Sequence, residues 1–425
     1  MIELGRDTIF ALSSGPPPAA IAVVRVSGPG ALEAAWTIAG RPPPPRRAGL
    51  RALKDEDGRL IDRALVLVFP KPDSATGEDL VELQLHGGRA VVAAVERALA
   101  AQGLRRAEAG EFTRRALANG RVDLAQAEGL ADLLQAETEA QRVQAIGAVE
   151  GAVSALARRF GERVLALSAE IEAALDFADE DDVVVDLREV GAAIATLRAE
   201  MANLVARPPV ERLRDGIRVV LTGPRNAGKS TLLNLLVQRE AAIVSPIAGT
   251  TRDVIEVPVV VEGVAYLVSD TAGLVDGTAD PVEAIGVERA RAAAQVADIV
   301  VWLGDDAPPA GAVWVWARAD EEGRGAPPSG VDVATASGRP ETIAALWRLV
   351  GTRTAQAPPR ADLPALNRRQ RDLVEEAAAE LVADDDPLIL AERLRRVRTA
   401  LARITGADAT EAMLDTLFGR FCIGK

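Results

Sequence analysis

The segment from Gly223 to Ser230 has the spacing of a loop that binds phosphate groups. It reads Gly-Pro-Arg-Asn-Ala-Gly-Lys-Ser, the pattern G-x-x-x-x-G-K-S. Glycines let such a loop turn tightly, so that successive main-chain N–H groups point at the phosphates. The lysine adds a positive charge, and the serine hydroxyl is suited to Mg²⁺. The predicted phosphate-binding residues are Asn226, Ala227, Gly228, Lys229, Ser230 and Thr231.

Two later motifs have the residue types that complete such a site. The segment 249–253 reads Gly-Thr-Thr-Arg-Asp, and Thr250 or Thr251 in it can bind Mg²⁺ and sense a γ-phosphate. The segment 270–273 reads Asp-Thr-Ala-Gly. Asp270 is expected at a strand end near the metal, and the Gly273 N–H is expected to face the γ-phosphate. The order of the three motifs predicts a GTPase-type domain that binds GTP with Mg²⁺.

The part of the site that would recognise guanine departs from the usual pattern. GTPase domains usually carry Asn-Lys-x-Asp there, whereas this chain reads Ala317-Arg318-Ala319-Asp320. A second guanine-binding loop normally follows this motif, and it is expected at 334–335, where the sequence is Ala-Thr. Losing the asparagine removes a hydrogen bond of about 1 kcal/mol, or more if a buried partner is left unpaired. Asp320 still favours guanine, but GTP affinity and selectivity stay open.

The segments around these motifs have the strand and helix patterns that would position them. A short apolar run at 217–221 predicts a buried strand before the loop, and 230–238 predicts a helix after it. A hairpin is expected from strands 257–261 and 265–269, and a further strand at 312–316. This alternation of strands and helices extends from 216 to about 355.

The rest of the chain divides into an α/β part and helical parts. Strands are expected at 21–26, 64–69 and 80–85 and a helix at 88–101. Long amphipathic helices are expected within 122–178, and further helices at 363–381, 387–404 and 407–419. We therefore predict a multidomain α/β plus all-α protein: an N-terminal α/β domain (1–118), a helical domain in two parts (119–215 and 357–425), and a P-loop domain (216–356) inserted between them.

Composition restricts the class of protein further. The chain has 425 residues, a formal net charge of −13 and one cysteine, Cys422. The acidic balance argues against binding nucleic acid over the whole surface, although not against a local basic patch. Absence of a signal peptide, of an 18-residue apolar run and of a possible internal disulfide predicts a cytoplasmic protein with no membrane contact.

Several blocks of the sequence resemble a known family. The ending Phe-Cys-Ile-Gly-Lys at 421–425 is similar to the C-terminus of the bacterial tRNA-modification GTPases called MnmE or TrmE. Further blocks agree at 21–28 (IAVVRVSG), 76–88 (TGEDLVELQLHGG), 110–113 (GEFT), 123–128 (DLAQAE), 176–180 (DFADE) and 249–253. The resemblance covers nearly the whole chain.

The resemblance implies an architecture and a function. It implies a folate-binding N-terminal domain that dimerises, a helical domain and an inserted GTPase domain. It also implies that a homodimer works with a flavin-dependent partner, MnmG (GidA), which alone holds FAD. Together they add a carboxymethylaminomethyl group to carbon 5 of the tRNA wobble uridine. The one-carbon unit comes from a tetrahydrofolate derivative (5,10-methylene or 5-formyl), and GTP hydrolysis drives conformational change.

The resemblance assigns further residues to the GTPase site. Asn226 matches the family asparagine that helps to hold K⁺, with backbone carbonyls near Ser245, Ile247 and Thr250. The ion would supply positive charge to the transition state. Ser230 and Thr251 match the Mg²⁺ ligands, and Glu283 matches the glutamate that orients the attacking water. Alternatively, Asn226 only shapes its loop and Glu283 is a solvated residue at a helix start.

The resemblance also places a folate site in the N-terminal domain. Arg25, Glu82, Arg121 and Lys425 fall on family positions, and a carboxylate such as Glu82 suits the pterin edge. A structural ion pair is the alternative for Arg25 and Glu82. Cys422 is either a thiol that takes part in the modification chemistry or an ordinary one.

Arginine clusters are the candidate tRNA contacts, and two other functions remain open. The clusters comprise Arg393, Arg395, Arg396, Arg398 and Arg403; Arg368, Arg369 and Arg371; and Arg105, Arg106, Arg114 and Arg115. Solvated faces paired with glutamate explain each cluster equally well. Because of Ala317 and Arg318, one alternative is a folate- and tRNA-binding subunit with a degenerate, non-hydrolysing nucleotide domain. A ribosome-assembly GTPase is the other.

Overall fold

A computed structural model describes most of the chain and divides it into two compact units. The described residues are 7–176, 187–207, 210, 216–224, 226–239, 255–261, 264–270, 297–321, 323–336, 340–354, 364–419 and 421–424. The first unit comprises Met1–Ala131, Ala148–Val185 and Asp386–Lys425, and the second comprises Asp132–Gly147 and Asp186–Asp385. Each unit is described by itself.

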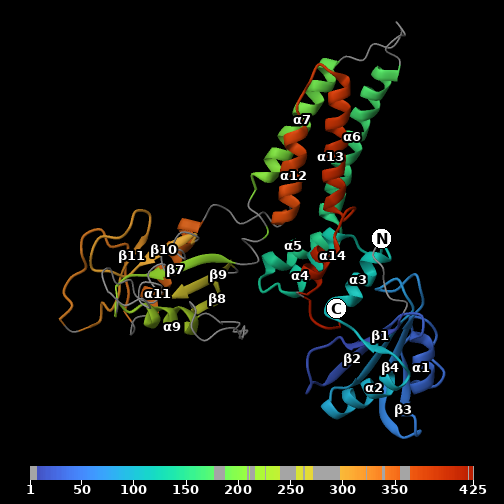
Figure 1. The fold of residues 1–425 in the computed structure, drawn as a ribbon. Helices are drawn as coiled ribbons and strands as arrows, with labels where there is room; N and C mark the ends of the chain where they lie inside the picture. Colours follow the sequence, from blue (N-terminus) through green and yellow to red (C-terminus); the bar gives the residue numbers. More distant parts are fainter. Residues whose placement is uncertain are drawn as a thin grey trace, which may run out of the picture. The chain divides into compact units, whose positions relative to one another are not determined.

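The first unit contains a mainly antiparallel sheet (Figure 1). Its strands are β1 (Ile9–Leu12), β2 (Ile21–Ser27), β3 (Gly49–Lys54), β4 (Leu60–Phe69), β5 (Leu80–His86) and β6 (Arg105–Arg106), in the order β3-β4-β5-β2-β1-β6. Only the β1–β6 pair among these is parallel. Strands β2, β4 and β5 confirm the predicted ones, extended by one to four residues. Strands β1 and β3 were not predicted from the sequence.

One face of this sheet is covered by the helices α1 (Ala31–Ala39) and α2 (Arg89–Ala101). Alternate residues of β2, namely Ala22, Val24 and Val26, are buried with residues of both helices in one hydrophobic core. Side chains from successive strand residues point to opposite faces. Arg25 therefore points to the other face, where its side chain is mostly buried.

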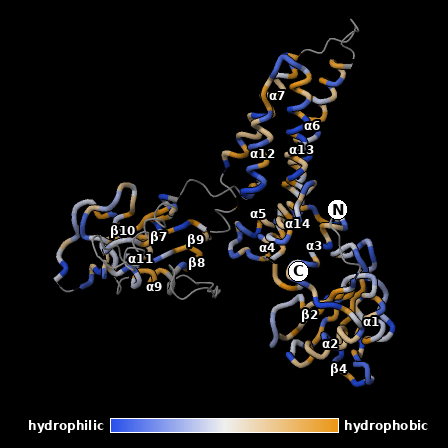
Figure 2. Tube along the Cα trace, in the orientation of Figure 1, coloured by the Kyte–Doolittle hydropathy of each residue, from blue (hydrophilic) through white to orange (hydrophobic). Residues whose placement is uncertain are grey.

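The helices of the first unit follow the α/β part or return to it from the C-terminus. They are α3 (Glu111–Ala118), α4 (Leu124–Leu134), α6 (Ala152–Asp176), α13 (Pro387–Ile404) and α14 (Glu411–Phe418), and α6 packs against α13. Hydrophobic and hydrophilic residues alternate along both (Figure 2). The α13 bounds confirm the prediction. The last helix begins four residues later than predicted, because the Thr410 side chain caps it by accepting the Met413 N–H.

The second unit holds the helices α7 (Leu187–Val205) and α12 (Arg368–Glu380), which pack together, and most of α5 (Glu139–Val149). Helix α12 begins later than the predicted residue 363. Asn367 and Gln370 form a capping box there, in which each side chain accepts the other residue's main-chain N–H.

A second sheet in this unit is mainly parallel. Its described strands are β7 (Ile217–Thr222), β8 (Ile255–Val261), β9 (Val264–Asp270), β10 (Ile299–Trp302), β11 (Val313–Trp316) and β12 (Val333–Ala334), in the order β12-β11-β10-β7-β9-β8. Of these described strands, only β8 pairs antiparallel, with β9. Its helices are α9 (Lys229–Arg239) and α11 (Pro340–Thr354). The inner strands β7, β9 and β10 are hydrophobic (Figure 2) and form a core with both helices.

No helix within the described ranges is long and apolar enough to span a membrane.

Candidate functional site

The phosphate-loop motif lies between a buried strand and a helix, as predicted. Strand β7 ends at Thr222, and α9 begins at Lys229. Gly223 has φ +144°, and a Cβ atom built on it would lie 3.1 Å from the main-chain carbon of Leu303. Only glycine fits that conformation and that close approach. The loop therefore starts where β7 passes the end of β10.

Lys229 points into this loop. Its side chain is buried, and Nζ donates to the main-chain oxygens of Gly223 (3.0 Å) and Pro224 (2.7 Å). Burial lowers the pKa of Lys229, and the nearby charge of Asp270 opposes that shift. The ammonium group thus donates to neutral carbonyls of the loop itself, and phosphate oxygens can take their place.

Ser230 and Asp270 come from different motifs and meet in the structure. Asp270 ends β9, which pairs parallel with β7 so that Asp270 lies opposite Leu221. Ser230 Oγ donates to Asp270 Oδ2 at 2.5 Å. Oδ1 of the same carboxylate is buried and has no hydrogen-bond partner among the described residues. A hydroxyl beside a carboxylate with an unused oxygen fits Mg²⁺, which prefers hard oxygen ligands.

The loop with the incomplete guanine motif lies next to the phosphate loop. Ala317 is buried at the end of β11, and Arg318 has φ +60°. A Cβ atom built on Gly228 would lie 3.5 Å from Arg318 Cγ, so the arginine stem lies against the phosphate loop. The Ala319 N–H donates to Thr335 O at 2.9 Å. The exposed Asp320 and residues 334–335 are therefore brought to one side of the phosphate loop. The loop predicted at 334–335 begins one residue later, because Ala334 pairs with Trp316 as the last residue of β12.

The remaining predicted nucleotide residues differ in how far the structure describes them. Ala227 is buried, whereas Asn226 and Thr231 are exposed, and Asn226 has φ +60°. The others lie outside the described residues: Ser245, Ile247, Thr250, Thr251, Gly273 and Glu283.

Arg25 and Glu82 lie opposite each other on β2 and β5. Arg25 donates to Glu82 Oε1 from Nε (3.1 Å) and from Nη2 (2.8 Å), and both side chains are about four-fifths buried. The Arg25 guanidinium also lies 5.7 Å from the ring centre of Phe112. The structural ion pair between Arg25 and Glu82, which was the alternative to a folate site, is thus present. It leaves a charged pair on the sheet face opposite the α1–α2 core.

The C-terminal segment returns to the same sheet. Ile423 forms an antiparallel bridge with Ala109, and a Cβ atom built on Gly424 would lie 2.1 Å from Leu12 O. Only glycine allows this approach, and Gly424 has φ +97°. Leu12 pairs with Val24, next to Arg25. The exposed thiol of Cys422 is therefore placed near the Arg25 strand, although 397 positions separate them in sequence.

Arg121 follows α3 and lies beside the 73–77 loop. Its Nη1 is 3.5 Å from Asp73 Oδ1, and its Cγ would lie 3.1 Å from a Cβ atom on Gly77. Of the predicted folate residues, the structure thus shows Arg25 and Glu82 in contact and Arg121 on a neighbouring loop. Lys425 lies outside the described residues.

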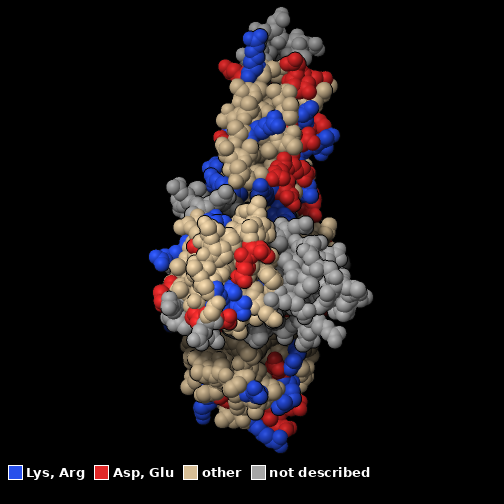
Figure 3. All heavy atoms as spheres, turned by 90° about the vertical axis from the view of Figure 1, so that its left-hand side faces the viewer, with Lys and Arg blue, Asp and Glu red and all other residues tan. Residues whose placement is uncertain are grey.

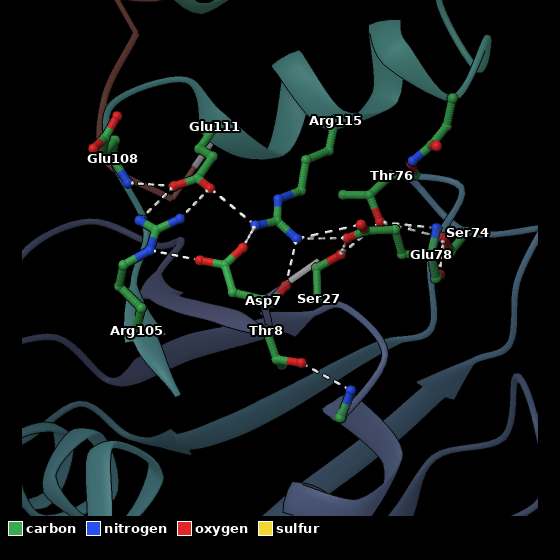
Figure 4. A network of polar contacts seen from close by, with 12 residues as sticks. Asp7, Thr8, Ser27, Ser74, Thr76, Glu78, Arg105, Glu108, Glu111 and Arg115 are labelled. Carbon is green, nitrogen blue, oxygen red and sulfur yellow. Dashed lines mark hydrogen bonds and ion pairs between the residues drawn. The ribbon is translucent and has the colours of Figure 1, made fainter. Parts of the chain in front are cut away.

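Beside this site is a network of charged residues centred on Arg115 (Figure 4). Arg115 is 1% exposed and donates to Asp7 Oδ1 (2.8 Å), Glu78 Oε2 (3.1 Å) and Glu111 Oε1 (3.0 Å). Arg105 donates to Glu111 at 2.6 Å and to Asp7 at 2.7 Å. The network joins the segment before β1, the loop before β5, β6 and α3, and so fixes the helix that presents Phe112.

The same contacts hold the carboxylates in their charged form. Burial raises the pKa of Glu111, but hydrogen bonds from Arg105, the Glu108 N–H and Arg115 outweigh it, so this pKa lies below its ordinary value. The pKa of Asp7 is likewise lowered against the effect of burial, through hydrogen bonds from Arg105 and Arg115. The network could not be predicted from the sequence, because Asp7 and Glu78 lie far in the chain from the residues at 105–115 that they contact.

The arginine clusters are mostly paired with acidic residues. The reading of Arg115 as part of a phosphate-binding face is wrong, because this side chain is buried and paired. Arg106 contacts Glu96, Arg114 contacts Glu411 and Asp415, and both Arg395 and Arg396 contact Glu392. On the face drawn in Figure 3, basic and acidic side chains are interspersed. Apart from the buried Arg115, the arginines named here therefore fit solvated, paired surfaces.

The fold and the site together define a P-loop GTPase-type domain in a chain that also contains an antiparallel-sheet domain and long helices. Two family models match this chain: "GTP-binding protein TrmE N-terminus" over residues 8–121, and "MnmE helical domain" over residues 124–422. The second covers more than half of the chain. The chain therefore belongs to the MnmE family of tRNA modification GTPases.

Curated relatives agree over the full length. The protein named tRNA modification GTPase MnmE from Erythrobacter litoralis is 54% identical over 424 residues, which cover 99% of this chain and 100% of that one. The protein of that name from Rhizorhabdus wittichii is also 54% identical, over 99% of this chain and 97% of its own. That from Zymomonas mobilis is 46% identical, over 98% and 100%.

Proposed function

We propose that this protein is a K⁺-stimulated GTP hydrolase that acts, with a flavin-dependent partner, in modifying carbon 5 of the tRNA wobble uridine. The observation that supports the hydrolase part best is the contact between Ser230 and Asp270, beside a buried Lys229. Two motifs that are separate in sequence supply three groups to one place: a cation and a hydroxyl from the phosphate loop, and a carboxylate from the end of β9. Together these three groups can bind a nucleoside triphosphate and its Mg²⁺.

In this proposal the chain's own groups bind and orient the nucleotide. Main-chain N–H groups of 226–231 hold the phosphates, and Lys229 exchanges its carbonyl partners for phosphate oxygens. Ser230 and Thr251 would hold Mg²⁺, with Asp270 behind them and the Gly273 N–H towards the γ-phosphate. Asp320 would accept hydrogen bonds from the guanine edge. Glu283 would orient the attacking water, through a second water.

The K⁺ site is proposed at the same loop. The Asn226 side chain and main-chain oxygens near Ser245, Ile247 and Thr250 would hold the ion, which supplies positive charge to the transition state. Asn226 is exposed and has φ +60°, so its side chain is available outside the packed core.

The one-carbon site is proposed around the Arg25–Glu82 pair. Glu82 would read the donor edge of a pterin, while Arg25, Arg121 and Lys425 would bind carbonyls or the glutamate tail of the folate. The return of the C-terminal segment to β1 supports a role for Cys422 there, because it puts a thiol near the pair. The proposed ligand is a 5,10-methylene or 5-formyl derivative of tetrahydrofolate.

The proposed assembly is a cytoplasmic homodimer with MnmG, which holds FAD, and tRNA as substrate. We also propose that the domain segments end at residues 118, 215 and 356. Nucleoside mass spectrometry of tRNA from cells that lack this chain tests the modification, which should disappear. Hydrolysis of GTP by the purified protein with Mg²⁺, in KCl against NaCl, tests the hydrolase. No turnover in KCl, even with the flavin partner, contradicts the proposal.

A second function is favoured by the sequence at 317–318. Ala317 cannot make the side-chain hydrogen bonds of an asparagine, so the nucleotide domain could be a non-hydrolysing part of a folate- and tRNA-binding subunit. Titration with labelled GTP and ATP separates the two functions. Selective micromolar binding of GTP supports the hydrolase, and no binding supports the second function.

A further inference from the structure

Arg324 holds the loop in which the asparagine of the usual guanine motif is missing. Its Nε donates to Ala317 O at 2.8 Å, and its Nη2 donates to Asp305 Oδ1 at 2.6 Å. The guanidinium also lies 4.9 Å from the ring centre of Trp316. The side chain is 15% exposed. One arginine therefore connects the end of β11, the loop after β10 and the far end of the 317–324 loop.

The 317–324 loop needs such support. Arg318 has φ +60°, a conformation that a residue other than glycine adopts uncommonly. Ala317 offers only its main chain, and its carbonyl group is the one that Arg324 binds. Arg324 makes three kinds of interaction: a hydrogen bond from its charged group to Ala317 O, an ion pair with Asp305 and a cation–π contact with Trp316. Each of these is stronger when it is partly buried.

The position of this loop decides where Asp320 lies. Between Ala317 and Asp320, the stem of Arg318 lies against Gly228, and Ala319 N–H donates to Thr335 O. A carboxylate reads a guanine edge only if its oxygens lie within hydrogen-bond distance of the base. Freeing the Ala317 carbonyl would let the loop, and Asp320 with it, move relative to the phosphate loop.

We propose that Arg324 is the positioning residue for base recognition in this chain, a role that it fills in place of the missing asparagine side chain. The inference rests on the proposed function, since it concerns the same nucleotide site. It predicts that Arg324 affects how well the protein distinguishes one base from another, and leaves the phosphate contacts unchanged.

The experiment measures the dissociation constants of GDP and IDP for the full-length protein. IDP lacks the 2-amino group of guanine, so the ratio of the two constants reports whether Asp320 is in place. Arg324→Met should weaken GDP binding about tenfold and IDP binding much less, so that the preference for GDP shrinks. Arg324→Lys, which can keep one hydrogen bond to Ala317 O, should recover part of the preference.

Arg353→Met is the matched control. Arg353 also donates to main-chain oxygens, those of Gly311 and Ala312, and pairs with Asp332, but it has no contact with the 317–324 loop among the contacts described. It should leave the ratio unchanged. If Arg324→Met does not fold, Asp305→Asn gives the same test with the Ala317 contact retained, and a smaller loss of preference is expected.

Two outcomes overturn the inference. The first is an unchanged ratio in Arg324→Met, either because neither dissociation constant changes or because both rise equally, which indicates general destabilisation. A wild-type protein that binds neither diphosphate would instead refute the proposed function, and the inference with it.

Discussion

Each of the two sheets lies beside a buried basic side chain, and the two side chains are partnered in opposite ways. Arg115, next to the first sheet, donates to the carboxylates of Asp7, Glu78 and Glu111. Lys229, at the end of a strand of the second sheet, donates to two main-chain carbonyls. Burial lowers the pKa of both groups. The charges of Glu78 and Glu111 reverse this for Arg115, whereas the pKa of Lys229 stays lowered.

The difference separates a structural cation from a binding one. A cation paired with several carboxylates has little to gain from a ligand, and removing it leaves buried negative charges without compensation. An ammonium group that contacts only neutral oxygens among the described residues can exchange them for phosphate at a gain in free energy. Variants at the two sites should therefore fail in different ways.

The largest effect is expected from Arg115→Met. The change removes the guanidinium partner of Glu78 and one of the two arginines that bind Glu111, and should lower the free energy of opening around β1 and β2 by about 3 kcal/mol. Hydrogen exchange of the amides in β1 and β2 of the full-length protein measures this. Arg106→Met removes an exposed arginine that pairs with Glu96 and should cost less than about 1 kcal/mol. Equal protection in both variants would contradict a structural role for Arg115.

Lys229→Ala should show the reverse pattern. We expect GTP turnover to fall by at least about 10²-fold, because a charge that stabilises the transition state is lost. Circular dichroism should remain that of the wild type, since among the described residues the amine donates to main-chain carbonyls and to no carboxylate. Lys54→Ala, on the exposed end of β3, is the control and should leave turnover unchanged. Turnover that survives in Lys229→Ala would place the phosphate site elsewhere.

Arg25→Ala tests whether the two sites are independent. Loss of a charged donor should weaken binding of 5-formyltetrahydrofolate about tenfold or more, measured by calorimetry. GTP turnover should change little, because Arg25 belongs to the first unit and the phosphate loop to the second. Arg63→Ala, an exposed arginine of β4, is the control. Equal losses of folate binding and turnover would mean that the sites are not separate.

The smallest effect is expected from acid. The folded-state pKa values of Asp7 and Glu111 are lowered, so the stability they contribute is present above their ordinary pKa values, about 4, and is lost as pH falls through the folded values. Hydrogen-exchange protection of β1 should therefore decrease below about pH 4.5. Glu111→Gln should weaken this dependence on pH. The same dependence in wild type and variant would assign it to other groups.

How much of each site the sequence predicted depends on how its residues are spaced. Gly223 to Ser230 is one continuous motif with a strand before it and a helix after it, so short-range patterns were enough to place it. Ser230 and Asp270 lie 40 positions apart. Asp270 was still predicted near the metal, because it follows an apolar strand. In the structure, the parallel pairing of β7 with β9 brings the two residues together. By contrast, β1 and β3 were missed because they are short and lie towards the sheet's edges.

The amino-acid sequence was sufficient for the class of protein, for the phosphate loop and for the loss of the asparagine at 317, because these depend on residue types at fixed short spacings. Tertiary structure decided which charges are paired and which side chains support others. From the sequence, Arg115 was one of several arginines predicted at the surface, and no role was predicted for Arg324. Their roles come from contacts with Asp7, 108 positions away, and Asp305, 19 positions away. Hydrogen bonds and ion pairs form between neighbours in space, and only the folded chain specifies those neighbours.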